Sequence, residues 1–482
     1  MTNKVIRNKY LKAALIILAM GLSILLSSVA YSATYYIDYI SGSDYNNGTS
    51  TSTPWKYAPG MSGWSGKVQL ANGDKVVLKG GVTWQFTSTK ADLWTLPTSG
   101  ITIQGGQRLN TPWGTGYPVL DATGTTSNQR VGFYINGKSN ITIDGIKIYN
   151  TEYSPSGGSG IFFHGIIRNL EVKNCYLDHT GDQSFRGGPS NGTSHILIHD
   201  NTTSNVGRLF IAVADENVVD DIQIYNNTFL GVGSWPGGIV GGVHGDGIMI
   251  GSACSAANTC LTNVKIHHNK FKSDWASGAT ALIYMNNGTG SSGSLYGGNH
   301  AEIYDNQFAI DTDGVISPAL VYIYSTWNDI KIYNNTFGAY YYGSHPISTC
   351  LFVSTTATNI DIKNNIFSGC TISAINATST SITSIDYNVY SPEIVRLINS
   401  WTGNQDCRNI ATCYSSFGQE EHGLRADPIF VQRPNGTPGH GNWTLQSSSP
   451  AIGKGINLSA FFITDLLCST RSGKWDIGAY KK

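Results

Sequence analysis

Ile222-Gln-Ile224-Tyr-Asn-Asn227-Thr-Phe229 is the stretch that decides the fold, because close variants of it return along most of the chain. Each full copy alternates apolar and polar residues, as a half-buried strand does, and then places an asparagine two residues before an aromatic ring, whereas the copies at Ile141, Leu170, Ile196 and Ile385 are weaker. Self-similarity at a period of 20 to 50 residues indicates a solenoid. The other copies begin at these positions: Ile141, Leu170, Ile196, Val264, Ala301, Ile330, Ile360 and Ile385.

A second apolar strand follows each copy, at 209–213, 248–250, 282–285, 320–324 and 351–353. Short strands with Gly and Asn between them, at a regular period, predict an all-β, single-domain parallel β-helix of about ten coils. Equivalent residues would then stack roughly 4.8 Å apart. We expect an inward aromatic ladder of Phe229, Phe271, Phe308, Phe337, Phe367 and Tyr390.

An asparagine ladder is expected at a tight bend of every coil. Asparagine tolerates the left-handed conformation, and its amide can bond to the next coil. The members of this ladder are Asn201, Asn227, Asn269, Asn306, Asn335, Asn365 and Asn388.

The two ends of the chain carry a resemblance as well. The opening segment Tyr35-Tyr-Ile-Asp-Tyr-Ile-Ser-Gly-Ser-Asp44 and the closing segments Asp427-Pro-Ile-Phe430 and Asp476-Ile-Gly-Ala-Tyr480 are of the kind found on secreted bacterial β-helix proteins. Over about residues 35–480 the chain resembles the right-handed parallel β-helix proteins of the pectate-lyase-like superfamily. This resemblance implies a right-handed solenoid with an N-terminal cap over 34–100, a body over 101–414 and a C-terminal cap over 415–482.

The first 33 residues read as a signal peptide. Four basic residues precede an apolar run from Ala13 to Leu26, and small residues follow near Ala33. Removal of this segment leaves 27 basic against 31 acidic residues, a net charge of −4. We therefore expect a secreted, periplasmic or cell-surface bacterial protein that binds neither nucleic acid nor, after signal removal, a membrane. The resemblance implies a monomer whose partner is a polysaccharide.

Eight cysteines in an exported chain favour disulfides. Two short loops can be closed, one by Cys254 with Cys260 and one by Cys407 with Cys413. Cys350 and Cys370 each come just before the second strand of successive coils, which puts them one coil apart and within bridging distance. Cys175 takes a position of the asparagine ladder, which favours a buried free thiol, whereas Cys468 has no assignment.

Side chains that face outward from the second strands are the candidates for function. Tyrosine rings suit the C–H faces of sugars, and arginine can hold a uronate carboxylate with two hydrogen bonds. Aromatic residues covered by a loop, and surface ion pairs with Asp182, Asp215 and Glu216, would produce the same pattern without a function. The outward set is His164, Arg186, Arg208, Phe210, Met249, Tyr284, Tyr322, Tyr324 and Phe352.

A polysaccharide lyase must neutralise a uronate carboxylate, remove the C5 proton and protonate the leaving oxygen. We assign the first task to Arg208, Arg186 or a bound Ca²⁺, the second to His244 with Asp246 orienting it or binding metal, and the third to Tyr284. His164, Arg186, Asp215, Tyr322 and Tyr324 would bind substrate. Gly- and Ser-rich inserts at 231–243, 251–263 and 286–299 would form the walls of the groove.

Two other functions stay open. A glycoside hydrolase needs two carboxylic acids about 5–10 Å apart, for which Asp246 with Asp215 or Asp182 are the candidates. A non-catalytic adhesin or carbohydrate-binding scaffold would use the same coils. Calcium has candidate ligands in the opening segment, which would otherwise form an Asx-rich turn: Asp38, Asp44, Asn46 and Asn47.

Overall fold

The computed structural model describes most of the chain from Ser32 onward. Its described residues are 32–87, 92–125, 130–151, 158–181, 183–206, 209–215, 218–232, 246–252, 261–275, 281–286, 298–310, 319–324, 326–339, 349–354, 356–377, 382–399, 406–433 and 441–482. The signal peptide therefore lies almost entirely outside the described residues and stays a prediction.

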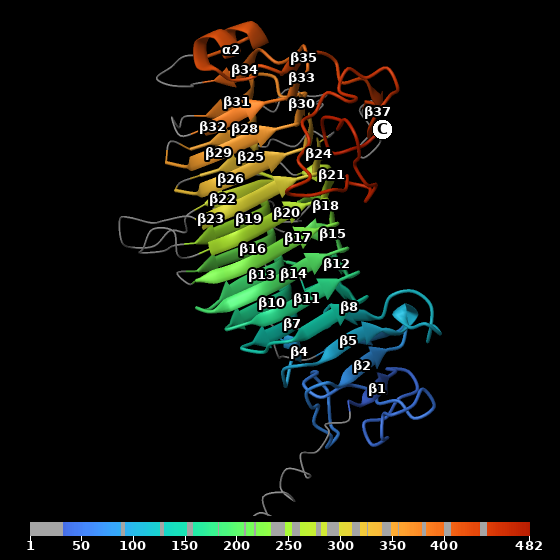
Figure 1. The fold of residues 1–482 in the computed structure, drawn as a ribbon. Coiled ribbons are helices and arrows are strands. Elements are labelled where there is room, and N and C mark those ends of the chain that lie inside the picture. The colour runs from blue at the N-terminus through green and yellow to red at the C-terminus, as the bar shows by residue number, and fades with distance from the viewer. Residues whose placement is uncertain are drawn as a thin grey trace, which may run out of the picture.

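Three long parallel sheets run along the molecule and form the walls of a right-handed parallel β-helix (Figure 1). Sheet 1 has 12 strands, in the order β1 (Thr34–Ile37), β2 (Lys75–Leu78), β5 (Thr102–Gly105), β8 (Ile141–Asp144), β11 (Arg168–Lys173), β14 (Thr193–His199), β17 (Val219–Tyr225), β20 (Leu261–His267), β23 (Gly298–Tyr304), β26 (Asn328–Tyr333), β29 (Thr358–Lys363) and β32 (Ile382–Asp386).

Sheet 2 has 11 strands, in the order β4 (Asp92–Thr95), β7 (Val131–Asn136), β10 (Ser159–Gly165), β13 (Gln183–Pro189), β16 (Leu209–Asp215), β19 (Asp246–Ser252), β22 (Ile283–Asn286), β25 (Ala319–Ile323), β28 (Thr349–Val353), β31 (Ser373–Ala377) and β34 (Arg396–Asn399). Sheet 3 has 12, in the order β3 (Thr83–Gln85), β6 (Val119–Asp121), β9 (Lys147–Tyr149), β12 (Tyr176–Asp178), β15 (Thr202–Val206), β18 (Thr228–Val232), β21 (Lys270–Trp275), β24 (Gln307–Ile310), β27 (Thr336–Ala339), β30 (Ile366–Ser368), β33 (Val389–Tyr390) and β35 (Leu424–Arg425).

From β2 to β34 each coil contains three strands, one per sheet, so that neighbours within a sheet are three strands apart in sequence, whereas at the ends β1 pairs with β2 and β35 with β33. The repeat beginning at Ile222 supplies β17, and its aromatic residue Phe229 lies in a separate strand, β18. The sequence pattern predicted the strands of sheets 1 and 2 and a bend at the asparagine, but it assigned no strand to the aromatic residues. These residues belong to a third sheet of short strands.

The aromatic ladder is confirmed. Consecutive rings from Phe229 to Tyr390 lie 4.8–5.4 Å apart between centroids, and all six rings are fully buried. Offset stacking of this kind adds about 0.5–1.5 kcal/mol per pair beyond the burial of area. The ladder therefore fixes the vertical register of the coils.

The asparagine ladder is confirmed as a chain of hydrogen bonds. The side-chain oxygen of Asn306 accepts from the backbone N–H and the amide of Asn269, and the Asn306 amide donates to Asn335 and to the carbonyl of Ile266. Cys175 donates its backbone N–H to Asn201 in the same way and is a buried free thiol, as expected.

The left-handed backbone conformation expected for the asparagines of the ladder is wrong. The residue before each of them is left-handed instead, for example Asp200 with φ 55°, Asn226 with φ 53° and Asn334 with φ 50°. The chain turns at this residue, and the next side chain then enters the interior, where the amide of Asn227 reaches the carbonyl of Ile198.

Two of the expected disulfides are confirmed, Cys350–Cys370 and Cys407–Cys413. Cys254 and Cys260 lie outside the described residues. Cys468 is a free, exposed thiol. In the part of the chain that the structure describes, no helix has the length and apolar character needed to cross a bilayer.

The C-terminal segment returns along the side of the solenoid. After the short helix α2 (Ile410–Phe417) and the hairpin of β36 (Phe430–Gln432) and β37 (Asn442–Leu445), it lies against the middle coils (Figure 1). Arg471 forms an ion pair of 2.6 Å with Asp305, and both side chains are at most 1% exposed. Within the described residues, β36 and β37 pair only with each other and add no strand to sheet 2.

Candidate functional site

The outward face of sheet 2 is where the candidate residues from different repeats meet. The backbone register aligns one position from each of ten consecutive strands, while the adjacent residues Ile248, Ile283 and Val321 are fully buried. Alternate side chains of a strand point to opposite faces, so the aligned positions with described side chains share the outer face, and Ala212 of β16 is aligned by its backbone alone. We call this set the sheet 2 column: Tyr134, Phe162, Arg186, Ala212, Met249, Tyr284, Tyr322, Phe352, Asn376 and Asn399.

Arg186 lies at the N-terminal part of this column. Its guanidinium sits 4.5 Å above the ring of Phe162, which in turn lies 5.4 Å from the ring of Tyr134. Arg186 is half-buried and makes no ion pair with any described residue. A cation held over an aromatic ring keeps its charge and its fork of donors for a ligand.

His164 lies beside the column and not within it. The register pairs His164 with Asn136 and Gly188, two residues further along the strands than Phe162 and Arg186. Its imidazole is exposed and its centroid lies 5.9 Å from that of Phe162. His164 and Arg186 therefore bracket Phe162 on one surface.

Tyr284, Tyr322 and Phe352 form the C-terminal part of the column. Tyr284 and Tyr322 stack at 5.2 Å, and the edges of Phe352 and of Tyr324 meet Tyr322 at 4.8 Å and 5.6 Å. Tyr284 is only 6% exposed, whereas Tyr324 is 46% exposed. Stacking from coil to coil uses one ring face of Tyr284, so Tyr324 presents the more open surface.

The phenol of Tyr322 is a proton donor at neutral pH. Burial, followed by the neighbouring Tyr284 and Tyr324, raises the pKa of Tyr322 to about 12. The group therefore stays protonated well above neutrality, which suits donation to a leaving oxygen and excludes action as a base.

The centre of the predicted site is described only in part. Arg208 and His244 lie outside the described residues, as do Asp182 and Glu216, and the side chains of Asp246 and Asp215 do too. The backbone pairs Asp246, the first residue of β19, with Leu209, the first residue of β16. The chain thus brings the starts of these two strands together.

Asp246 and Asp215 belong to opposite ends of their strands. Asp215 pairs with Ser252, six residues along β19 from Asp246. At a rise of about 3.3 Å per residue this separates the two backbone positions by about 20 Å. Two carboxylates that act on one glycosidic bond lie within about 10 Å of each other, so the register disfavours this pair for hydrolysis.

Arg186 and Tyr284 lie three strands apart, which corresponds to about 14 Å. They do not contact the same atom of a ligand. Their common face is long enough for an extended ligand that meets each of them at a different unit.

The acidic residues of the opening segment have protein partners. Asp38 accepts from Lys79 at 2.8 Å and from Ser41, and Asp44 accepts from the backbone of Tyr57 and Ser65. These contacts are those of an Asx-rich turn and leave the residues a poor fit for calcium. Within the described ranges, no group of three or more His, Cys, Asp or Glu is arranged to hold a metal.

A second column of rings, absent from the predictions made from the sequence, lies on the outward face of sheet 1. His199, Tyr225, His267 and Tyr304 stack nearly parallel at 4.5–4.9 Å, and Phe462 of the C-terminal segment covers Tyr304. Burial lowers the pKa of His267 well below its usual range. The signal was present, because each of these residues directly follows the second apolar residue of its repeat.

No family model and no curated protein matches this chain. Among solved structures it is similar to pectate lyase Pel9A, at 17% identity over 95% of this chain and 98% of that one with a TM-score of 0.45. It is also similar to XylC in complex with xylose (9% identity, 93% and 98% covered, TM-score 0.49) and to a rhamnogalacturonan lyase (13%, 86% and 97%, TM-score 0.40). These values are too low to support more than a description of the fold.

Proposed function

We propose that this protein is an exported carbohydrate-active enzyme that cleaves an acidic, uronate-containing polysaccharide by β-elimination on the outward face of sheet 2. The observation that supports this best is the position of Arg186, a cation without a described ion pair, in a column of aromatic residues. Such a surface favours a long, anionic sugar chain. Two disulfides fit an exported protein.

The reaction needs three groups around one uronate. Arg208, with Arg186 at a neighbouring unit, would hold the carboxylate and so stabilise the charge that develops when C5 loses its proton. His244, oriented by Asp246, would take that proton. The C4–O4 bond then breaks, a C4–C5 double bond forms, and the leaving oxygen takes a proton from the phenol of Tyr284, which stacks on Tyr322.

Ultraviolet absorption by unsaturated uronates, recorded on pectate, alginate, glycosaminoglycans and bacterial exopolysaccharides, tests this proposal. Release is expected on one polymer class and should disappear in His244→Ala. Arg186→Ala should lower kcat/KM about 10- to 150-fold through a higher KM, the loss expected for a charge-assisted hydrogen bond. Arg186→Lys should recover only part of the lost kcat/KM, because lysine keeps the positive charge but cannot donate two parallel hydrogen bonds to a carboxylate.

The matched control is Lys363→Ala, which removes one positive charge from sheet 1, where Lys363 is paired with Asp361. It should leave cleavage unchanged. Equal effects of Arg186→Ala and Lys363→Ala would contradict the placement of the site on sheet 2.

A non-catalytic carbohydrate-binding scaffold is the second candidate, and the 6% exposure of Tyr284 favours it, because a donor must reach its substrate. Binding of a polysaccharide without unsaturated products or new reducing ends, equal in wild type and His244→Ala, would identify the scaffold. New reducing ends without ultraviolet absorption would identify hydrolysis instead.

A further inference from the structure

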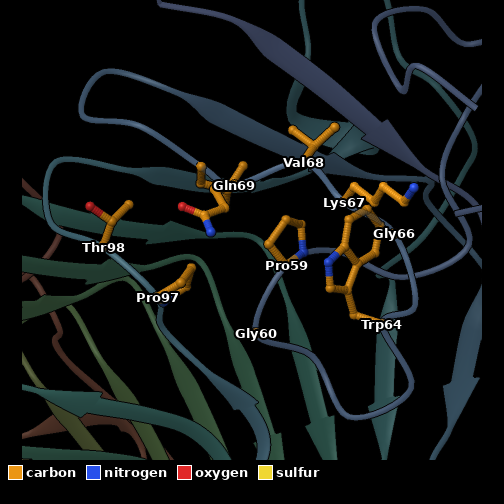
Figure 2. A pocket seen from close by; sticks show the side chains of 10 residues that line it. Pro59, Gly60, Trp64, Gly66, Lys67, Val68, Gln69, Pro97 and Thr98 are labelled. Carbon is orange, nitrogen blue, oxygen red and sulfur yellow. The ribbon is translucent and has the colours of Figure 1, made fainter.

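A pocket of about 530 Å³ lies at the N-terminal end of sheet 2, outside the predicted site. One part of its wall comes from the segment between β1 and β2, and the other from the residues directly after β4. In Figure 2, Trp64 and Lys67 lie at one end of the pocket and Pro97 and Thr98 at the other. Its volume is within the range of about 300–1,000 Å³ that small-molecule sites have.

The pocket continues the outward face of sheet 2. Thr95 of β4, the end strand of this sheet, pairs with Tyr134 and so extends the sheet 2 column by one strand. Trp94 and Leu96 are buried, so the alternation places Thr95 and Pro97 together on the outer side. β4 is three strands from the strand of Arg186, about 14 Å away.

The segment that forms the wall is fixed against β4. Met61 bridges to Trp94 in the antiparallel sense, and Thr95 donates its backbone N–H to the carbonyl of Gly60 at 3.1 Å. This contact covers the free edge of sheet 2 and holds the pocket at the end of the outer face. The relation between pocket and column therefore belongs to the fold itself.

The indole of Trp64 is held in place before any ligand arrives. Its ring meets the buried Trp55 at 5.0 Å, and the chain at Gly66 runs so close that a Cβ there would lie 2.4 Å from the ring. The carboxylate of Asp44 accepts from the backbone and the hydroxyl of Ser65, which pins the intervening turn. A fixed aromatic ring loses little entropy on binding.

The chemistry of the lining suits an acidic sugar. Trp64 is half-buried and offers an aromatic surface, Lys67 is exposed and makes no ion pair within the described part of the chain, and Gln69 adds an exposed amide. Aromatic surface, one cation and one amide match the C–H face, the carboxylate and the hydroxyls of a uronate.

We infer that this pocket binds one end of the acidic polysaccharide whose middle lies on the sheet 2 column, an inference that rests on the proposed function. The ligand class is a terminal uronate residue. The pocket then acts as an anchor for the end of the sugar chain, and only oligosaccharides that reach from the Arg186 region past β4 gain from it.

Calorimetric affinities for short and long oligosaccharides of the cleaved polymer, measured in the inactive His244→Ala background so that the ligand stays intact, test this inference. His244→Ala itself should bind the long ones more tightly than the short ones. Trp64→Ala and Lys67→Ala should each weaken long oligosaccharides about 3- to 10-fold and leave short ones unchanged. Lys67 is exposed, so its variant tests the pocket without a change in folding, and Lys454→Ala, another exposed lysine, is the control.

Three results would overturn the inference, and they are distinguishable. If both pocket variants bind long oligosaccharides as tightly as the unmodified pocket does, and the wild type still cleaves the polymer, the pocket does not bind a chain end. The proposed function is not contradicted by that result. A wild type that neither binds nor cleaves any acidic polymer removes both. Equal losses for short and long oligosaccharides would show that Trp64 and Lys67 act on the fold and not on a chain end.

Discussion

Replacement of Asn306 by alanine should destabilise the solenoid strongly, because this residue connects three coils. Its side chain makes four hydrogen bonds, two accepted from Asn269 and two donated to Asn335 and Ile266, and it is fully buried. At a net value of about 0.5–1.5 kcal/mol per bond, the loss amounts to about 2–6 kcal/mol. The backbone N–H of Asn269 is then left buried without this partner, which favours the upper part of that range.

Urea unfolding followed by circular dichroism measures the change in the free energy of unfolding. Asn306→Asp should destabilise at least as much as Asn306→Ala, because its buried carboxylate would face the side-chain oxygen of Asn335 and the carbonyl of Ile266, to which it cannot donate. Asn457→Ala is the control: this asparagine is exposed and accepts one hydrogen bond, from Ser459, so about 1 kcal/mol or less is expected. Equal losses in Asn306→Ala and Asn457→Ala would refute the ladder as a source of stability.

Three further predictions concern the C-terminal half. Burial raises the pKa of Glu420 to about 8, against 4.5 in the unfolded chain. The protonated carboxyl therefore contributes stability that is complete below pH 4.5 and is lost as the pH rises through 8, and the total loss is on the order of 5 kcal/mol. Glu420→Gln should remove this pH dependence, so that the urea midpoints vary less between pH 5 and pH 9. Replacing Cys350 and Cys370 together by alanine should cost about 3 kcal/mol in the same assay at constant pH, because their loop spans 20 residues. Arg471→Ala should cost about 3–5 kcal/mol, because Asp305, whose pKa burial already raises well above its usual range, is left buried without its partner. Proteolysis of the C-terminal segment should then accelerate, and an unchanged cleavage rate would contradict its docking.

The sequence predicted those parts of the fold that repeat in strict register. Asn227, Asn269 and Asn306 recur at one place in each repeat, and so do Phe229 and Phe271, so their stacking followed from a period alone. The third sheet did not follow, because strands such as β30, with three residues, are too short to show an alternation.

The sequence repeat could not predict contacts between segments that lie far apart in the chain. Arg471 meets Asp305 across 166 residues, and Glu420 ends the asparagine ladder by accepting from Asn388 at 2.7 Å. Neither partner repeats, so no period predicts them. The pocket at Trp64 was missed for the same reason, since it depends on how an irregular segment lies against β4.

The face of the candidate site was predictable, while positions within it were not. Alternation placed Arg186 and Tyr284 on the outer side of sheet 2, and the register confirms that they share one column. The lateral offset of His164 depends on where β10 pairs with β13, which a bend of unknown length decides. The roles of Arg208, His244 and Asp246 stay predictions.

A crystal structure of His244→Ala with a long oligosaccharide of the acidic polymer tests the central claim most directly. We expect sugar density along the outward face of sheet 2, with a uronate carboxylate bound by Arg186 and sugar rings near Phe162 and Tyr324. Sugar bound on sheet 1 instead, with Arg186 untouched, would contradict it.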